Sequence, residues 1–163
     1  MPEILTRPAT RDDLGAMAVI LNPIIRAGGT TAYEEEMSAE AIGKKVIDDP
    51  TLVSTVVALD AAGAVAAFQW VARYDPPETH VGGIASFARL NPKLPGAGRA
   101  MFAATCAACR AAGLTAIDAL IRADNVPGLS YYGAMGFQDH ALHEGVPLND
   151  GTPVDRVVKR FML

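Results

Sequence analysis

Apolar residues near the N-terminus recur with the spacing of a helix. The stripe consists of Leu14, Met17, Ala18, Leu21 and Ile25. Residues three or four positions apart share one face of a helix, so this face is expected to be buried against the rest of the protein. Thr10, followed by Asp13, is a capping signal for the helix, and Gly28 ends it. Pro23 is expected to bend or divide it.

Two further elements are predicted around this helix. The segment Glu3–Arg7 predicts a short strand that is closed by Pro8, because proline cannot donate to a sheet ladder. Ser38 is a cap for a second helix, which stops by Pro50 because the residue before a proline avoids the helical region.

From residue 52 onward, runs rich in β-branched residues alternate with helical segments. The predicted strands are Leu52–Leu59, Ala64–Tyr74, His80–Leu90, Thr115–Arg122, Phe137–Val146 and Val154–Phe161, and the predicted helices are Gly98–Ala112 and Pro127–Met135. The turn residues of Asp60–Gly63 join the first two strands into a β-hairpin. A hairpin followed by alternating strands and helices is typical of a mixed sheet. The sequence therefore predicts a single α+β domain over residues 1–163.

Composition narrows the class of function. The chain has 163 residues, half of them hydrophobic, which suffices for one sizeable core. The net charge of −4 gives no basic surface of the kind that nucleic acid or an anionic membrane needs. No apolar stretch approaches the roughly 20 residues of a transmembrane helix, and the N-terminus lacks the pattern of a secretory signal. We therefore expect a cytoplasmic protein that acts on a small molecule, without a nucleic-acid or membrane partner.

The two cysteines lie inside a predicted helix. Cys106 and Cys109 are three positions apart, so their side chains share one face beside alanines. A redox pair with this spacing normally sits at a helix start, where the helix dipole lowers the thiol pKa. We predict that both are buried core thiols with no redox or metal role.

A glycine turn, KLPGAGRAM, lies between an apolar run and the helix Gly98–Ala112. Unpaired N–H groups at a helix start, together with the helix dipole, favour a bound phosphate. By itself the turn is equally compatible with a structural role. A dinucleotide fingerprint requires a third glycine at Met101, and a Walker A loop requires Gly-Lys-Ser or Gly-Lys-Thr, and the sequence has neither.

A second segment, ADNVPGLSYYGAMGF, places Asn125 before a helix and Tyr132 four residues before Gly136. Together with the glycine turn, it resembles the acetyl-CoA-binding core of the GNAT superfamily of N-acetyltransferases. In that superfamily the turn reads Gln or Arg, two residues, Gly, one residue, then Gly or Ala. The segment Lys93–Gly98 follows this frame, with lysine at the first position and with Pro95, which offers no N–H.

The resemblance implies a three-layer α+β fold, in which a mixed, mostly antiparallel sheet of about seven strands is flanked by about four helices. The sheet would splay between its fourth and fifth strands to admit acetyl-CoA. The resemblance also implies direct acetyl transfer to a primary amine, without a metal or a covalent enzyme intermediate. The implied cofactor-binding residues are Phe87, Ala88, Arg89, Lys93, Leu94, Gly96, Ala97, Gly98, Arg99, Ala100, Asn125 and Tyr132.

Within this set the implied roles differ. Phe87, Ala88 and Arg89 would meet the peptide-like pantetheine arm through their backbone, as an added strand does. The amides from Gly96 to Ala100 would cradle the pyrophosphate, and Lys93 or Arg99 would add charge. Asn125 would contact the cofactor, although a helix cap alone would also explain it.

Tyr132 is the candidate general acid. Coenzyme A leaves as a thiolate, and a phenol with a pKa near 10 remains protonated at neutral pH and can protonate it. Its spacing to Gly136 matches the superfamily pattern, so we prefer it over Tyr131. The structural alternative is that both tyrosines are core aromatics.

The acceptor side is predicted from GGTTAYEEEMSAEAI, which resembles the phosphinothricin acetyltransferase and amino-acid N-acyltransferase branch. Tyr33 and Glu35 are the matching positions, and a carboxylate there could hold an ammonium group. The superfamily's Glu on the central strand corresponds to Gly83, which leaves the general base unassigned. His80 is a possible substitute. His140 and His143 are not expected to bind a metal, because odd spacing in a strand points them to opposite faces.

An alternative function is an acyl-CoA-binding regulatory or sensory module with little or no catalysis, which Gly83 and Pro95 favour. A nucleotide enzyme of the Rossmann type is a third hypothesis, which the missing third glycine opposes. The resemblance further suggests a possible homodimer that uses an exposed sheet edge. The amine acceptor would be a small molecule such as an amino acid or an analogue.

Overall fold

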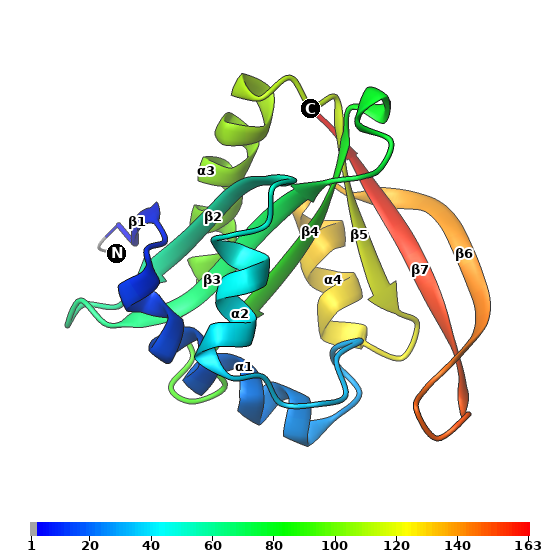
Figure 1. Ribbon diagram of the computed structural model, residues 1–163, viewed down its shortest axis with the longest axis horizontal. Coiled ribbons are helices and arrows are strands. Elements are labelled where there is room, and N and C mark those ends of the chain that lie inside the picture. Colours follow the sequence, from blue (N-terminus) through cyan, green and yellow to red (C-terminus); the bar gives the residue numbers. More distant parts are fainter. Residues whose placement is uncertain (1–2) are drawn as a thin grey trace.

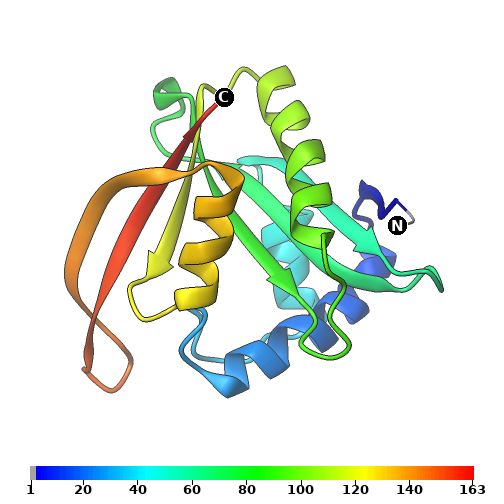
Figure 2. The ribbon, with the colours of Figure 1, turned by 180° about the vertical axis from the view of Figure 1, so that it is seen from behind.

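The chain forms a seven-stranded sheet with helices on both faces. The computed structural model describes residues 3–163, and its strand order is β1-β2-β3-β4-β5-β7-β6. The strands are β1 (Leu5–Pro8), β2 (Leu52–Leu59), β3 (Val65–Arg73), β4 (Val81–Ala88), β5 (Ala116–Arg122), β6 (Gln138–Pro147) and β7 (Pro153–Met162). The helices are α1 (Leu14–Ala27), α2 (Ala39–Val46), α3 (Ala97–Ala111) and α4 (Val126–Met135). Helices α1 and α2 cover one face, and α3 and α4 cover the other (Figures 1 and 2). The predicted three-layer α+β architecture is therefore confirmed.

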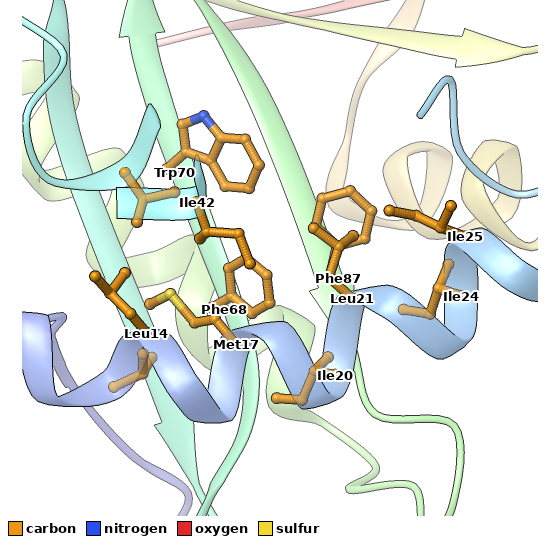
Figure 3. Packing of buried hydrophobic residues seen from close by; sticks show 12 residues of the cluster. Leu14, Met17, Ile20, Leu21, Ile24, Ile25, Ile42, Phe68, Trp70 and Phe87 are labelled. Atoms are coloured by element: carbon orange, nitrogen blue, oxygen red, sulfur yellow. The ribbon is translucent and has the colours of Figure 1, made fainter. Parts of the chain in front are cut away.

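The apolar stripe of α1 packs onto the first half of the sheet. Met17 and Leu21 are almost completely buried. They belong to one cluster with Phe68 and Trp70 of β3 and Phe87 of β4 (Figure 3). This is the burial that the helical spacing of the apolar residues predicted.

Two prolines behave differently from the prediction. Pro23 does not divide α1, which is continuous from Leu14 to Ala27. The carbonyl that loses its N–H partner belongs to Val19, which is 74% exposed, so water can replace that partner. Pro8 is the last residue of β1 rather than the residue after it, and it pairs with Val56. An edge strand tolerates proline because its outer side needs no donor.

Helix α3 covers the opposite face and buries both cysteines. Cys106 and Cys109 are free thiols in a cluster with Phe102 and Ile117. Burial raises the pKa of Cys106, and it raises the pKa of Cys109 to about 12. Both thiols are therefore protonated at neutral pH. This confirms the prediction that they are core residues.

The remaining strands close the far side of the sheet. The predicted C-terminal strand pair is confirmed, because β6 and β7 pair antiparallel and β7 also pairs with β5. No helix between residues 3 and 163 is long and apolar enough to cross a membrane. Among the same residues, no group of three or more His, Cys, Asp or Glu side chains is arranged to hold a metal ion.

Candidate active site

The sheet opens between β4 and β5. These two strands are parallel and pair only where Val81–Ile84 lies beside Ala116–Ala119. Beyond this point β4 continues to Ala88 and β5 to Arg122, and the two strands diverge with α4 behind the opening (Figures 1 and 2). The second half of β4 is therefore hydrogen-bonded to β3 on one side only.

The backbone of β4 presents alternate residues to this opening. Arg89 donates its N–H to the carbonyl of Ala66, and the carbonyl of Val81 accepts the N–H of Tyr74, so odd-numbered residues face β3. The register between β3 and β4 is continuous. Consequently the N–H and C=O groups of Ser86 and Ala88 point to the side that lacks a strand, where an extended ligand can pair with them.

A cavity of about 250 Å³ lies at the opening. It is lined by the ends of β4 and β5, by the loop between α1 and α2, and by α4. The polar side chains of its lining include Tyr33, Ser86, Arg122, Asn125 and Tyr132. Polar residues from four separate parts of the sequence therefore meet at one place.

The glycine turn forms the start of α3, as predicted. Gly96 is the N-cap with φ of +86°, a left-handed conformation that a side chain would strain. The N–H of Ala97 bonds to Leu94 and that of Ala100 bonds to Gly96. The N–H groups of Gly98 and Arg99 are the first-turn donors without a helical acceptor. Of the amides from Gly96 to Ala100 that were predicted to cradle a phosphate, those of Ala97 and Ala100 are already hydrogen-bonded within the turn.

Tyr132 lies on α4 and lines the cavity. Its ring is buried between Tyr131 and Phe137, and its hydroxyl is 3.0 Å from Oγ of Ser86. Burial raises the pKa of the Tyr132 hydroxyl well above its usual value, and the hydrogen bond with Ser86 partly opposes that effect. Tyr132 is therefore a neutral phenol throughout the physiological pH range.

Solved structures share this architecture over nearly the whole chain. A ribosomal-protein-alanine N-acetyltransferase from Brucella melitensis matches with a TM-score of 0.85 and 21% identity, over 98% of this chain and 99% of that one. A GNAT superfamily phosphinothricin acetyltransferase from Sinorhizobium meliloti, in complex with acetyl-CoA, matches with a TM-score of 0.85 and 20% identity, over 98% of this chain and 88% of that one. The chain has the GNAT fold. The structure of yncA from Salmonella typhimurium with its cofactor acetyl-CoA is also similar, with a TM-score of 0.84 and 15% identity over 99% and 95% of the two chains.

No family model matches the sequence, and no curated protein matches it significantly. Similarity of shape therefore identifies the GNAT fold where overall sequence similarity does not. The resemblance that the glycine turn and the segment around Tyr132 indicated is confirmed at the level of the fold, including the opening between the fourth and fifth strands.

Within the GNAT fold, the predicted strand residues differ in how they meet the opening. Ala88 turns its backbone toward it, whereas the backbone groups of Phe87 and Arg89 face β3. Phe87 contributes its ring to the cavity wall. The guanidinium of Arg89 donates to Asp60 at 2.8 Å and to the carbonyl of Pro92 at 2.6 Å. Arg89 therefore fixes the approach to α3 rather than offering a free charge to a cofactor.

Lys93 and Arg99 are both exposed and flank the glycine turn, and Leu94 is partly buried against the core beside α3. The two cations are available to an anion at the start of α3.

Asn125 has two structural bonds. Its Oδ1 accepts the N–H of Gly128 at 3.0 Å, which caps α4, and its Nδ2 donates to the carbonyl of Thr30 at 3.0 Å. The second bond ties α4 to the loop between α1 and α2, which forms part of the cavity wall. Asn125 therefore shapes the cavity through the backbone that it holds.

We expect Asn125→Ala to destabilise the protein by about 1 kcal/mol, because the helix loses its N-cap. Denaturant unfolding measures this change. Asn149→Ala is the matched control, since the side chain of Asn149 is exposed in a loop, and its free energy of unfolding should change by less than about 0.5 kcal/mol. Equal stability of both variants would contradict the capping role.

Of the two loop residues predicted for the acceptor side, Tyr33 and Glu35, only Tyr33 lines the cavity. Tyr33 lines the cavity, and its ring lies 6.2 Å from that of Phe87, centroid to centroid. Burial raises the pKa of Tyr33. Glu35 is exposed and is not part of the cavity lining, while the carboxylate of its neighbour Glu34 accepts the N–H of Asn149 at 3.0 Å. The loop contributes an aromatic wall, and its acidic residues lie outside the lining.

His80 is far from the opening. It precedes β4, whereas the opening begins after Ile84. Ser86 is six positions after His80, which corresponds to about 20 Å along an extended strand. His80 is not among the residues that line the cavity, so the structure does not support the role suggested for it from the sequence.

The space beside Gly83 is filled by the ring of Tyr74. A Cβ built on Gly83 would lie 2.6 Å from Cε1 of Tyr74, so the tyrosine ring occupies the space that a Glu would need. Among the described residues that line the cavity there is no carboxylate and no imidazole. The lining therefore supplies neither of the side-chain types that most often act as a general base.

Sequence reasoning missed the polar residues behind Tyr132. Gln69 is completely buried, and it bonds to Ser86 of β4 and Thr105 of α3. The signal was present in the sequence, because Gln69 is the single amide within the apolar strand AVAAFQWVA. A buried amide needs hydrogen-bond partners, so its position in a strand interior points to a polar network.

Proposed function

We propose that this protein transfers an acetyl group from acetyl-CoA to the primary amine of a small molecule such as an amino acid or an analogue. The observation that carries the proposal is that Tyr132 lines the cavity between β4 and β5 and that its hydroxyl bonds to Ser86, which lines the same cavity. The uncovered backbone of Ser86 and Ala88 would pair with the pantetheine arm. The amides of Gly98 and Arg99 would receive the pyrophosphate, and Lys93 and Arg99 would add positive charge.

In this reaction the amine nitrogen forms a bond to the thioester carbon, and the carbon–sulfur bond then breaks. The electron pair of that bond leaves with sulfur as a thiolate. Tyr132 gives its proton to the thiolate, so that coenzyme A departs as a thiol. The amine loses its proton to water. The GNAT structures solved with acetyl-CoA support acetyl-CoA as the donor.

A rival function is an acyl-CoA-binding module without efficient catalysis. The cavity lining favours it in one respect, because among the described residues it lacks a carboxylate or imidazole that would act as a base. Calorimetry with acetyl-CoA, combined with a thiol-release assay across amino acids, polyamines and peptides, separates the two functions. Binding with turnover on an amine supports the transferase. Binding without turnover on any amine supports the module, and failure to bind contradicts both.

The missing base predicts a characteristic pH dependence. Only a neutral amine attacks, so kcat/KM should rise tenfold per pH unit below the pKa of the acceptor amine. Because burial raises the pKa of Tyr132, its hydroxyl stays protonated up to about pH 10. No decline of the rate is therefore expected at any pH up to that value. Rates measured from pH 6 to 10 with two acceptors of different amine pKa test this.

The pH range over which kcat/KM rises should shift with the amine pKa of the acceptor. If kcat/KM instead rises near pH 6.5 for both acceptors, a histidine acts as the base.

A further inference from the structure

Four buried or half-buried side chains connect Tyr132 to the interior of the sheet. Nε2 of Gln69 donates to Oγ of Ser86 at 2.8 Å and to the hydroxyl of Tyr131 at 3.1 Å. Thr105 Oγ1 donates to Oε1 of Gln69 at 2.6 Å. The hydroxyl of Tyr131 continues to the carbonyl of Gly98 at 2.8 Å. The network joins β3, β4, α3 and α4 directly behind the cavity.

The direction of these bonds is fixed by the groups at their ends. A carbonyl only accepts, so Thr105 must donate to Gln69, and Tyr131 must donate to Gly98. Both N–H groups of the Gln69 amide then point at Tyr131 and Ser86. Ser86 accepts from Gln69, and its own proton remains available for another oxygen.

Ser86 also touches Tyr132, at 3.0 Å between the two oxygens. In the resting state the phenol donates to Oγ of Ser86. When the phenol has lost its proton, the same contact allows Ser86 to donate to the phenolate oxygen. Ser86 can reverse this bond because Gln69 donates to its oxygen and leaves the Ser86 proton available.

Reversal of the hydrogen bond between Ser86 and Tyr132 would make it easier for the buried phenol to give up its proton. A phenol has a pKa near 10 and a thiol one near 8.5, so a phenol gives its proton to a thiolate reluctantly. Burial makes the transfer harder, because a phenolate in an apolar environment is poorly solvated. A hydroxyl that donates to the phenolate lowers that barrier.

We propose that Ser86, held in place by Gln69, is a positioning residue that orients the hydroxyl of Tyr132 and stabilises its phenolate after proton transfer. The inference rests on the proposed function, since it needs Tyr132 as the acid. In the step concerned, the O–H bond of Tyr132 breaks, an S–H bond forms on coenzyme A, and Ser86 turns its O–H toward the phenolate. Solvent then returns a proton to Tyr132, and Ser86 accepts from the phenol again.

The test is a double-mutant cycle between Ser86 and Tyr132. Ser86→Ala should lower kcat about tenfold and leave the KM for acetyl-CoA within about threefold, because the lost hydrogen bond acts mainly on the proton transfer. In the Tyr132→Phe background the same substitution should have no further effect on kcat. Ser86→Thr keeps the hydroxyl and should recover most of the rate.

Ser130→Ala is the matched control, because Ser130 is exposed on the same helix as Tyr132 and should leave kcat unchanged. Thermal unfolding of each variant checks that it is folded. If Ser86→Ala lowers kcat equally in both backgrounds, or lowers only acetyl-CoA affinity, the positioning role is overturned. If the unmodified protein transfers no acetyl group to any amine, the proposed function itself fails, and this outcome is distinct from the other two.

Discussion

We expect Tyr132→Phe to lower kcat about 100-fold, while the Kd for acetyl-CoA stays within about threefold. General acid catalysis typically contributes a factor of 10² to 10⁴, and phenylalanine removes only the oxygen that carries the proton. The ring still fills its place beside Phe137, so the packing of α4 is kept. Single-turnover rates of thiol release and calorimetry with acetyl-CoA measure the two quantities separately.

Tyr74→Phe is the control for this substitution. Tyr74 is 39% exposed, lies against Gly83 and does not line the cavity, so the same loss of a phenolic oxygen should leave kcat unchanged. A Tyr132→Phe variant with an unchanged kcat would remove Tyr132 from the mechanism. A variant that loses acetyl-CoA affinity instead would make Tyr132 a binding residue.

The second large effect is expected at Gly98. A Cβ on Gly98 would lie 2.4 Å from Cε1 of Tyr131, far inside normal contact, so Gly98→Ala must displace that ring. The displacement breaks the bonds of the Tyr131 hydroxyl to Gly98 and Gln69. We expect a loss of about 1–3 kcal/mol in the free energy of unfolding, which is typical of overpacking. Acetyl-CoA should also bind at least about tenfold more weakly, because the first turn of α3 must shift with it.

Two further variants make the Gly98 prediction specific. Gly133→Ala on α4 adds the same methyl group in open space at a helical position, so it should stabilise the protein by up to about 1 kcal/mol. Combining Gly98→Ala with Tyr131→Leu removes the clashing ring edge and should recover part of the stability lost. If Gly98→Ala unfolds at the same denaturant concentration as the unmodified protein, the contact with Tyr131 is not a constraint.

The glycine turn shows which structural requirements a local sequence pattern can predict. Its two glycines before a helix predicted a phosphate site, and the structure places them at the start of α3. Gly96 is needed for its left-handed backbone, whereas Gly98 is needed because Tyr131, more than 30 positions later, packs against it. The first requirement is local and readable from the sequence. The second depends on how α4 docks against α3.

His80 and Glu35 show the opposite case. Glu35 was predicted from a match to the phosphinothricin acetyltransferase branch and His80 as a substitute for the superfamily's Glu, and neither is in the cavity lining. The position of a residue along a strand decides which end of the sheet it reaches. The point where β4 and β5 separate depends on where their backbone pairing ends. No periodicity in the sequence specifies that point.

The sequence by itself determined the order and type of the elements, the buried stripe of α1, the helix start at the glycine turn and the candidacy of Tyr132. The first three follow from hydrophobic spacing and turn chemistry, which act between residues close together in the chain. The candidacy of Tyr132 follows from the resemblance of its segment to the GNAT superfamily. Only the tertiary structure decided that Gln69, Ser86 and Tyr132 touch, because their contact requires the register between β3 and β4 and the docking of α4. It also decided where the sheet opens, since strands part only where their ladder of hydrogen bonds ends.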